Sequence, residues 1–249
     1  MIDTAFDFTT DAGNYWEGFW DRNDGLGYGA TDPDNASPTL QEYHRLLWSR
    51  KLPNGQVMRL KKGRSSYDYL SWRDFRFGSD FIIVGFRYER YRYMMEQVKE
   101  SVGDFRTYYE DLIRRSYTIG GMIIFPKHVN SINQSRGRST ILSDRWDLTM
   151  ECIRRYYSGE DSPIGSVLKA DAKFFDLFVD FKGYVDFFFL NDCVSSDYSR
   201  VDIWEGDGKL EGDGLPKTLD GYFQFIKQEF EFLAKRNQRI AEYARKNGL

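Results

Sequence analysis

Residues Tyr117 to Pro126 read Tyr-Thr-Ile-Gly-Gly-Met-Ile-Ile-Phe-Pro and form the longest apolar run without a charge. A short apolar run that ends at a proline is typical of a buried strand, because a strand covered on both faces has no alternating polar positions. We therefore predict a central strand over residues 119–125. The pair Gly120-Gly121 indicates a bulge or the close approach of another backbone.

The connector after this strand holds the densest cluster of basic and polar side chains. Between Lys127 and Arg155 there are six Lys or Arg residues and three acids. A segment that leaves a buried strand and enters a helix N-terminus is suited to anions, because free backbone N–H groups and the helix dipole add to the forked donors of arginine. The candidate ligand-binding residues are Lys127, Asn133, Arg136, Arg138 and Arg145, and the candidate catalytic residue is His128, as a general acid or base.

A structural role for the same cations is the alternative. They would then pair with the acidic segment 205–213 or with Asp residues of the first helix. Arg154 and Arg155 end a predicted helix over 143–157, where their charges suit the helix dipole and pair with acids one turn away. Any ligand site is therefore expected in residues 127–142.

Composition limits the class of protein. The chain has 249 residues, a net charge of −3 and a hydrophobic fraction of 41%. A weakly acidic protein does not coat nucleic acid through bulk charge, since that binding depends on neutralising many phosphates. The 20 Phe and 17 Tyr residues exceed ordinary usage, and they serve either an aromatic core or a surface on which bases or sugars stack.

Cysteine usage and the N-terminus predict a cytoplasmic protein. Cys152 and Cys193 lie in apolar surroundings without metal-site spacing, which favours buried free thiols. The N-terminus lacks the basic and apolar regions of a signal peptide, and no apolar run reaches the roughly 18 residues of a membrane span. We expect no membrane association.

The hydrophobic pattern predicts an α+β fold with a small, mainly antiparallel sheet and a helical C-terminal half. Asn54-Gly55 is a strong hairpin signal before the strand candidates 57–60 and 67–77. Helices are expected from Ser37-Pro38, over 79–100, 104–115, 143–157 and 162–182, narrowly over 185–190, and from Thr218 onward. We predict one domain over 1–249, with strands in 1–126 and mainly helices in 143–249.

Catalytic and metal motifs are absent from the sequence. There is no phosphate-binding Gly-x4-Gly-Lys loop, no His-Glu-x-x-His and no Gly-x-Ser-x-Gly, and the chain has only two histidines. The Asp–x–Lys pairs at 171/173 and 180/182 lie on a predicted helix, so we give them no catalytic weight. Asp21 to Gly25 lacks calcium-loop spacing. No metal is expected, the cofactor is unknown, and whether the protein is an enzyme stays open.

His44 lies beside the apolar stripe of the helix that begins at Pro38. A lone histidine in that place is a packed, hydrogen-bonded core residue or, alternatively, a proton carrier or ligand.

Several segments together resemble an uncharacterised family of bacterial proteins of about 250 residues. The resemblance is carried by residues 37–44, 47–49, 52–55, 117–126, 136–137, 144–157 and 180–188. It implies a bacterial, cytoplasmic protein and no known activity. The acidic stretch Glu205 to Asp213 departs from the family's pattern.

Two functions are consistent with these patterns. The first is binding, with or without processing, of a nucleotide or nucleic-acid phosphate by the 127–145 connector. The second is a non-catalytic interaction component of a toxin, defence or mobile-element system, with a protein partner bound through Tyr15, Trp16, Phe19 and Trp20. Sugar binding by Trp16 and Trp20 is a weaker alternative.

Overall fold

The computed structural model describes residues 1–23, 31–65, 68–82, 92–127, 132, 141–206, 208–211 and 214–249. Within them, four strands form one antiparallel sheet in the order β1-β2-β3-β4. The strands are β1 (Lys61–Ser65), β2 (Asp68–Trp72), β3 (Phe75–Phe81) and β4 (Met122–Pro126). The predicted α+β class, with a small antiparallel sheet and a helical C-terminal half, is confirmed.

Helices cover the sheet. The N-terminal part supplies α1 (Phe19–Asn23), α2 (Pro33–Ala36), α3 (Pro38–Trp48), α4 (Arg92–Ser101), α5 (Phe105–Ser116) and the 3-10 turn η2 (Ile119–Gly121). The C-terminal part supplies α7 (Trp146–Ser158), α8 (Gly165–Ala170), α9 (Ala172–Phe175), η4 (Asp176–Phe178), α10 (Phe181–Phe188), η5 (Asn191–Cys193) and α11 (Leu219–Asn247).

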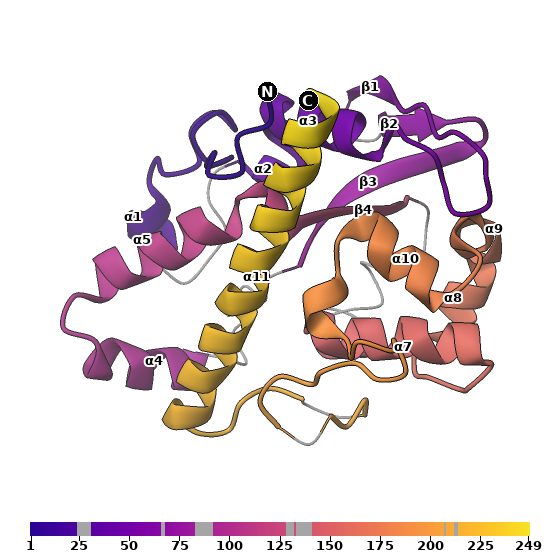
Figure 1. Ribbon diagram of the computed structural model, residues 1–249. Helices are drawn as coiled ribbons and strands as arrows, with labels where there is room; N and C mark the ends of the chain where they lie inside the picture. Colours follow the sequence, from indigo (N-terminus) through magenta and orange to yellow (C-terminus); the bar gives the residue numbers. More distant parts are fainter. Residues whose placement is uncertain are drawn as a thin grey trace.

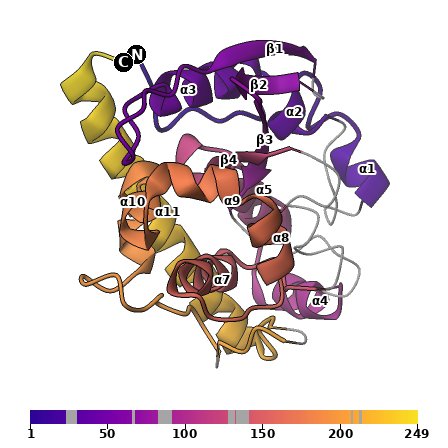
Figure 2. The ribbon, with the colours of Figure 1, turned by 90° about the vertical axis from the view of Figure 1, so that its right-hand side faces the viewer.

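The long helix α11 runs past the sheet, and α7 to α10 form a separate group beside it (Figure 1). After a quarter turn, α3 and the group of α7 to α10 are seen on different sides of the strands (Figure 2). Tyr69 of β2 contacts His44 of α3, and Phe77 of β3 packs against Phe174 of α9. The two chain ends lie together, where the Ile2 N–H donates to the Leu249 carbonyl at 3.1 Å.

Several helix starts follow the capping chemistry expected from the sequence. The Ser37 hydroxyl accepts the Leu40 N–H at 3.0 Å, and Pro38 occupies the first helical position. Thr218 likewise accepts the Gly221 N–H at 3.1 Å at the start of α11. These local signals fix where α3 and α11 begin.

The apolar run does form a strand, and every residue of β4 is buried. Its predicted central position is wrong, since β4 ends the order of the described sheet; its Phe125 packs against Trp146 of α7. The predicted close approach of another backbone is confirmed at Gly121, whereas Gly120 is approached by a side chain. A Cβ on Gly121 would lie 2.0 Å from the Ser116 carbonyl oxygen, and one on Gly120 would lie 2.6 Å from the side-chain oxygen of Asn237.

Arg236 of α11 holds this region from the other side. Its Nε donates to the Phe188 carbonyl at 3.1 Å, and its Nη1 donates to the carbonyls of Met122, at 2.9 Å, and Gly120. Burial lowers the pKa of the Arg236 guanidinium to about 9, which keeps it protonated at neutral pH. One side chain thereby joins α11 to η2, β4 and the end of α10.

Three predicted helices differ in the structure. Ser79 and Asp80 belong to β3 and pair with Ile124 and Ile123, because burial of β4 favours strand pairing over a local helix cap; residues 83–91 lie outside the described part. The helix predicted from Ser143 begins at Trp146, since the Ser143 hydroxyl instead accepts the Gly214 N–H. The helix predicted over 162–182 is divided into α8, α9 and η4 before α10.

The narrow preference for helix over 185–190 is confirmed by α10 as far as Phe188. The strand candidate 57–60 contributes only a bridge between Val57 and Lys51.

Substituting Gly121 with alanine should lower the free energy of unfolding by at least about 3 kcal/mol, because backbone must move to relieve the clash with the Ser116 carbonyl. Gly103 is the matched control, since a Cβ there meets nothing within 4 Å. Urea unfolding of Gly121→Ala and Gly103→Ala measures both. Equal stability of the two variants would contradict the packing described.

Candidate functional site

The predicted connector site falls largely outside the described residues. This holds for His128, Asn133, Arg136 and Arg138. Lys127 is described: its N–H donates to the Arg76 carbonyl at 2.8 Å, and burial lowers the pKa of its amine. That these side chains form one ligand-binding site therefore stays a prediction.

Arg145 is the other described member, and it is buried in an ion pair. Its guanidinium binds both oxygens of Asp147, with Nε 3.1 Å from Oδ1, and also donates to the Gly214 carbonyl. Asp147 in turn accepts the Trp204 N–H at 2.9 Å. The pair ties the start of α7 to segment 204–214 through backbone groups. Arg145 therefore has a structural role, but its acidic partner is Asp147 and not an acid of segment 205–213 or of the first helix.

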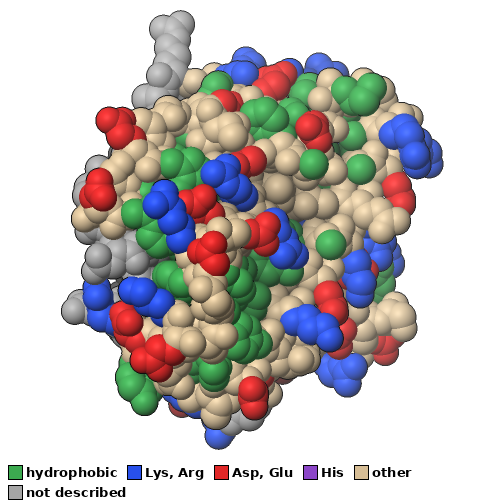
Figure 3. Space-filling view, turned by 90° about the vertical axis from the view of Figure 1, so that its left-hand side faces the viewer, with side chains coloured by type: hydrophobic (Ala, Val, Ile, Leu, Met, Phe, Trp, Pro, Cys, Tyr) green, Lys and Arg blue, Asp and Glu red, His purple; other side chains and the backbone are tan. Residues whose placement is uncertain are grey.

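The aromatic N-terminal segment is partly core. Tyr15 and Phe19 are buried, while Trp16 and Trp20 are half-buried. The Trp20 indole donates to Glu110 of α5 at 2.8 Å. On the face of the molecule shown in Figure 3, acidic and basic side chains are interspersed, in line with the pairs Arg106–Glu110, Arg114–Asp7 and Arg115–Asp111. The four aromatic rings thus do not all face outward.

His44 is fully buried, with Nδ1 3.1 Å from the Tyr69 hydroxyl. Burial, followed by the positive charge of Arg236, lowers the pKa of His44 to about 3. His44 is therefore a neutral, packed and hydrogen-bonded core residue, which is the first of the two roles expected from the sequence.

This buried histidine predicts a dependence of stability on pH. Its pKa is about 3 in the folded state, below the usual 6.5, so between these values the unfolded chain binds a proton that the folded chain does not. Above about pH 6.5 His44 has no effect on the free energy of unfolding. As the pH falls below this value, His44 lowers the free energy of unfolding increasingly, by about 2 kcal/mol at pH 5. The difference between the unfolding free energies of wild type and His44→Gln should follow this curve. Parallel pH profiles would contradict it.

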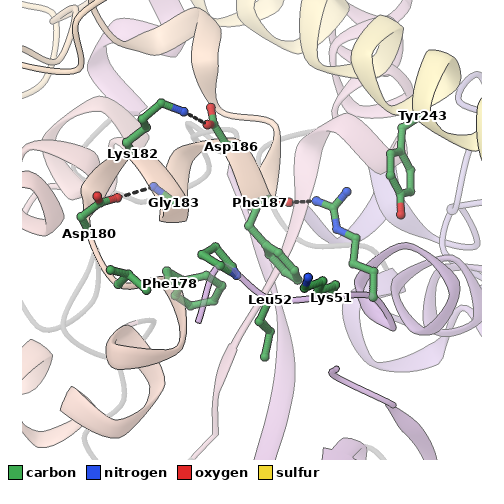
Figure 4. A pocket seen from close by; sticks show the side chains of 12 residues that line it. Lys51, Leu52, Phe178, Asp180, Lys182, Gly183, Asp186, Phe187 and Tyr243 are labelled. Atoms are coloured by element: carbon green, nitrogen blue, oxygen red, sulfur yellow. Dashed lines mark hydrogen bonds and ion pairs between the residues drawn. The ribbon is translucent and has the colours of Figure 1, made fainter. Parts of the chain in front are cut away.

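A pocket of about 630 Å³ lies elsewhere, between the turn that follows α3 and the start of α10. It is lined by Arg50, Lys51, Leu52, Pro53, Phe178, Val179, Asp180, Lys182, Gly183, Asp186, Phe187 and Tyr243. In Figure 4, Asp180 and Lys182 lie on one side, Tyr243 on the other, and Lys51, Leu52 and Phe178 below. The pocket therefore has charged side chains from the start of α10 at one end and Tyr243 at the other.

Arg50 forms part of the wall and is enclosed by aromatic rings. Its guanidinium carbon lies 4.5 Å from the ring centre of Phe187, 4.4 Å from that of Phe189 and 4.5 Å from that of Tyr243. It donates to the Phe187 carbonyl. Burial lowers the pKa of Arg50, and its hydrogen bond with Tyr243 opposes this effect. The rings fix the guanidinium in one orientation.

The charges at this end have no acidic partner within the described residues. Arg50 and the exposed Lys51 each line the pocket, and neither forms an ion pair there. The opposite end differs, because Lys182 is paired with Asp186. Burial would raise the pKa of Asp186, but hydrogen bonds from Lys182, Tyr198 and Asn191 together lower it. The excess positive charge therefore lies beside Arg50.

A strained turn borders the pocket. Val179 has φ 72° and ψ −53°, and the Asp180 N–H donates to the Phe178 carbonyl at 2.9 Å, two residues back. This is the rare, non-inverse form of the γ-turn, which costs about 1–3 kcal/mol for a residue with a side chain. Asp180 then caps α10 by accepting the Gly183 N–H at 2.7 Å.

Sequence reasoning missed this site. The Asp180/Lys182 pair has no catalytic signature in the sequence, and in the structure Asp180 is a helix cap. Arg50 and Lys51 gave no signal, because their neighbours at 187 and 243 are distant in sequence. The nearest local sign was the hairpin signal Asn54-Gly55, whose Asn54 N–H donates to the Leu177 carbonyl at 3.3 Å.

Over the described residues, no group of three or more His, Cys, Asp or Glu side chains is placed to hold a metal ion. None of the described helices is long and apolar enough to cross a membrane.

Comparison with known proteins gives a family and no activity. Neither the curated proteins nor the solved structures contain a match to this chain. Residues 2–240 match the family of unknown function DUF6994, and the chain belongs to that family. The resemblance to an uncharacterised family is thereby confirmed.

Proposed function

We propose that this member of the family is a binding protein for a small organic anion, held in the pocket between residues 50–53 and α10. The observation that carries the proposal is the positive charge of Arg50 in the pocket wall, which contacts aromatic rings and a carbonyl but no carboxylate within the described residues, with the exposed Lys51 next to it in the chain. A partly buried charge such as that of Arg50 is normally paired, since leaving it without a counter-charge is costly. A carboxylate or phosphate of a ligand supplies that counter-charge through charge-assisted hydrogen bonds.

The remaining features of the pocket support a small molecule. Its volume of about 630 Å³ lies within the roughly 300–1,000 Å³ usual for such sites. The exposed side chains of Pro53 and Val179 offer apolar surface for the ligand's body. At the far end, the Asp180 carboxylate already occupies the N-terminus of α10, so the ligand's anionic group is directed toward Arg50 and Lys51.

The hypothesis of a nucleotide or nucleic-acid phosphate bound at residues 127–145 shares this chemistry and differs in location. It stays a prediction for Lys127, His128, Asn133, Arg136 and Arg138. The interaction role of the aromatic N-terminal segment also stays a prediction.

The test holds the ligand's body constant and changes its head group. Phenyl phosphate, benzoate and benzamidine carry the same ring with a phosphate, a carboxylate and a cation. We expect phenyl phosphate or benzoate to raise the melting temperature and benzamidine to leave it unchanged. The stronger of the two anions identifies the preferred head group. Isothermal titration then gives the affinities.

Lys51→Gln should weaken anion binding about threefold to tenfold, because it removes an exposed charge at the pocket. Lys169→Gln is the matched control, since Lys169 is exposed on α8 and does not line the pocket. An Arg136→Ala/Arg138→Ala variant should bind as wild type does. Loss of binding in that variant alone would place the site in the connector. Binding of benzamidine as tight as that of phenyl phosphate and benzoate would contradict the proposal.

A further inference from the structure

Val179 differs from the other non-glycine residues of positive φ in the described chain, which are Arg73, Phe189 and Tyr198. Phe189 ends α10 and packs on Tyr243, and the Tyr198 hydroxyl donates to Asp186 at 2.8 Å. Arg73 stacks on Trp72. Each of these side chains makes contacts that offset an unfavourable backbone conformation.

The Val179 side chain makes no comparable contact, since it is 62% exposed. Its conformation is also the most demanding, because valine is branched at Cβ and lies in the γ-turn region, where side chains are rarely found. Neither packing nor chain propensity therefore explains a valine at this position.

The backbone on both sides leaves the turn no freedom. Phe178, which precedes Val179, is fully buried. Gly183 lies so close to it that a Cβ on Gly183 would be 2.1 Å from the Phe178 carbonyl oxygen and 3.2 Å from Pro53. With Asp180 fixed as the cap of α10, the exposed methyl groups of Val179 are held at one place on the pocket lining.

We infer that Val179 is a specificity-determining residue of the pocket, and that the ligand class is an anion with an apolar body, aryl or branched alkyl. The inference rests on the proposed function and adds the nature of the ligand's body. The anionic group lies against Arg50 and Lys51, the body covers Pro53, and its far end contacts Val179. A strained, rigid contact loses no conformational entropy when the ligand binds.

The experiment holds the phosphate head constant and changes the body, with phenyl phosphate, glycerol 3-phosphate and inorganic phosphate as probes. Val179→Thr keeps the shape and the backbone strain and replaces a methyl group by a hydroxyl. Val179→Gly removes both the side chain and the strain. Melting temperatures without ligand separate effects on folding from effects on binding.

Wild type should bind phenyl phosphate at least about fourfold more tightly than glycerol 3-phosphate, the factor expected for one buried methyl-sized contact. Val179→Thr and Val179→Gly should each lose about that factor for phenyl phosphate only, and bind inorganic phosphate as wild type does. Val179→Gly should melt no lower than wild type, since it relieves strain.

Two results would overturn the inference about Val179 while leaving the proposal of an anion-binding pocket intact. One is unchanged binding of phenyl phosphate in both variants while Lys51→Gln still weakens it. The other is a melting temperature of Val179→Gly several degrees below wild type, which makes Val179 a packing residue. If wild type binds none of the three probes, the pocket proposal fails and this inference fails with it.

Discussion

The C-terminal end of α10 is bound by two arginines, and the placement of the pocket depends on that arrangement. The carbonyls at the end of a helix have no partners within it and carry the negative end of its dipole. Here the Phe188 carbonyl accepts Arg236, and the neighbouring Phe187 carbonyl accepts Arg50. One arginine lies in the core and the other in the pocket wall.

Helix α11 connects these two environments. Arg236 and Tyr243 are seven residues apart, about two turns, and so project from the same face of α11. Arg236 also binds carbonyls of η2 and β4, while Tyr243 stacks on Arg50. Helix α11 therefore fixes the positions of β4, the end of α10 and Arg50 of the pocket relative to one another.

Three partly or fully buried guanidinium groups have their charge balanced by different means. Arg236 is compensated by aligned carbonyl dipoles, at the cost of a lowered pKa, and His44 nearby stays uncharged. Arg145 is compensated by Asp147. Arg50 has aromatic faces, one carbonyl and the Tyr243 hydroxyl, but no carboxylate partner within the described residues, which is why we propose it as the group that meets a ligand's anion.

Local chemistry in the sequence was enough for the fold class, the starts of α3 and α11, and the crowding at Gly120-Gly121. It was not enough for β3, because Ser79 and Asp80 resemble a helix cap until β4 pairs with them. The density of basic residues indicated a site in the connector, but the sequence alone does not show that Arg145 forms a buried ion pair with Asp147. The pocket could not be predicted because it is formed by residues near 50, 180 and 243, which are far apart in the sequence. The backbone conformation of Val179 also has no sequence signature.

We propose that an organic anion binds with its charge at Arg50 and Lys51 and its body toward Val179. A crystal structure of the chain grown with phenyl phosphate would locate both ends of the ligand. We expect the phosphate within hydrogen-bond distance of the Lys51 amine and the ring in contact with the Val179 methyl groups. A phosphate bound instead by Arg136 and Arg138, with the pocket between residues 50 and 187 lacking the ligand, would contradict it.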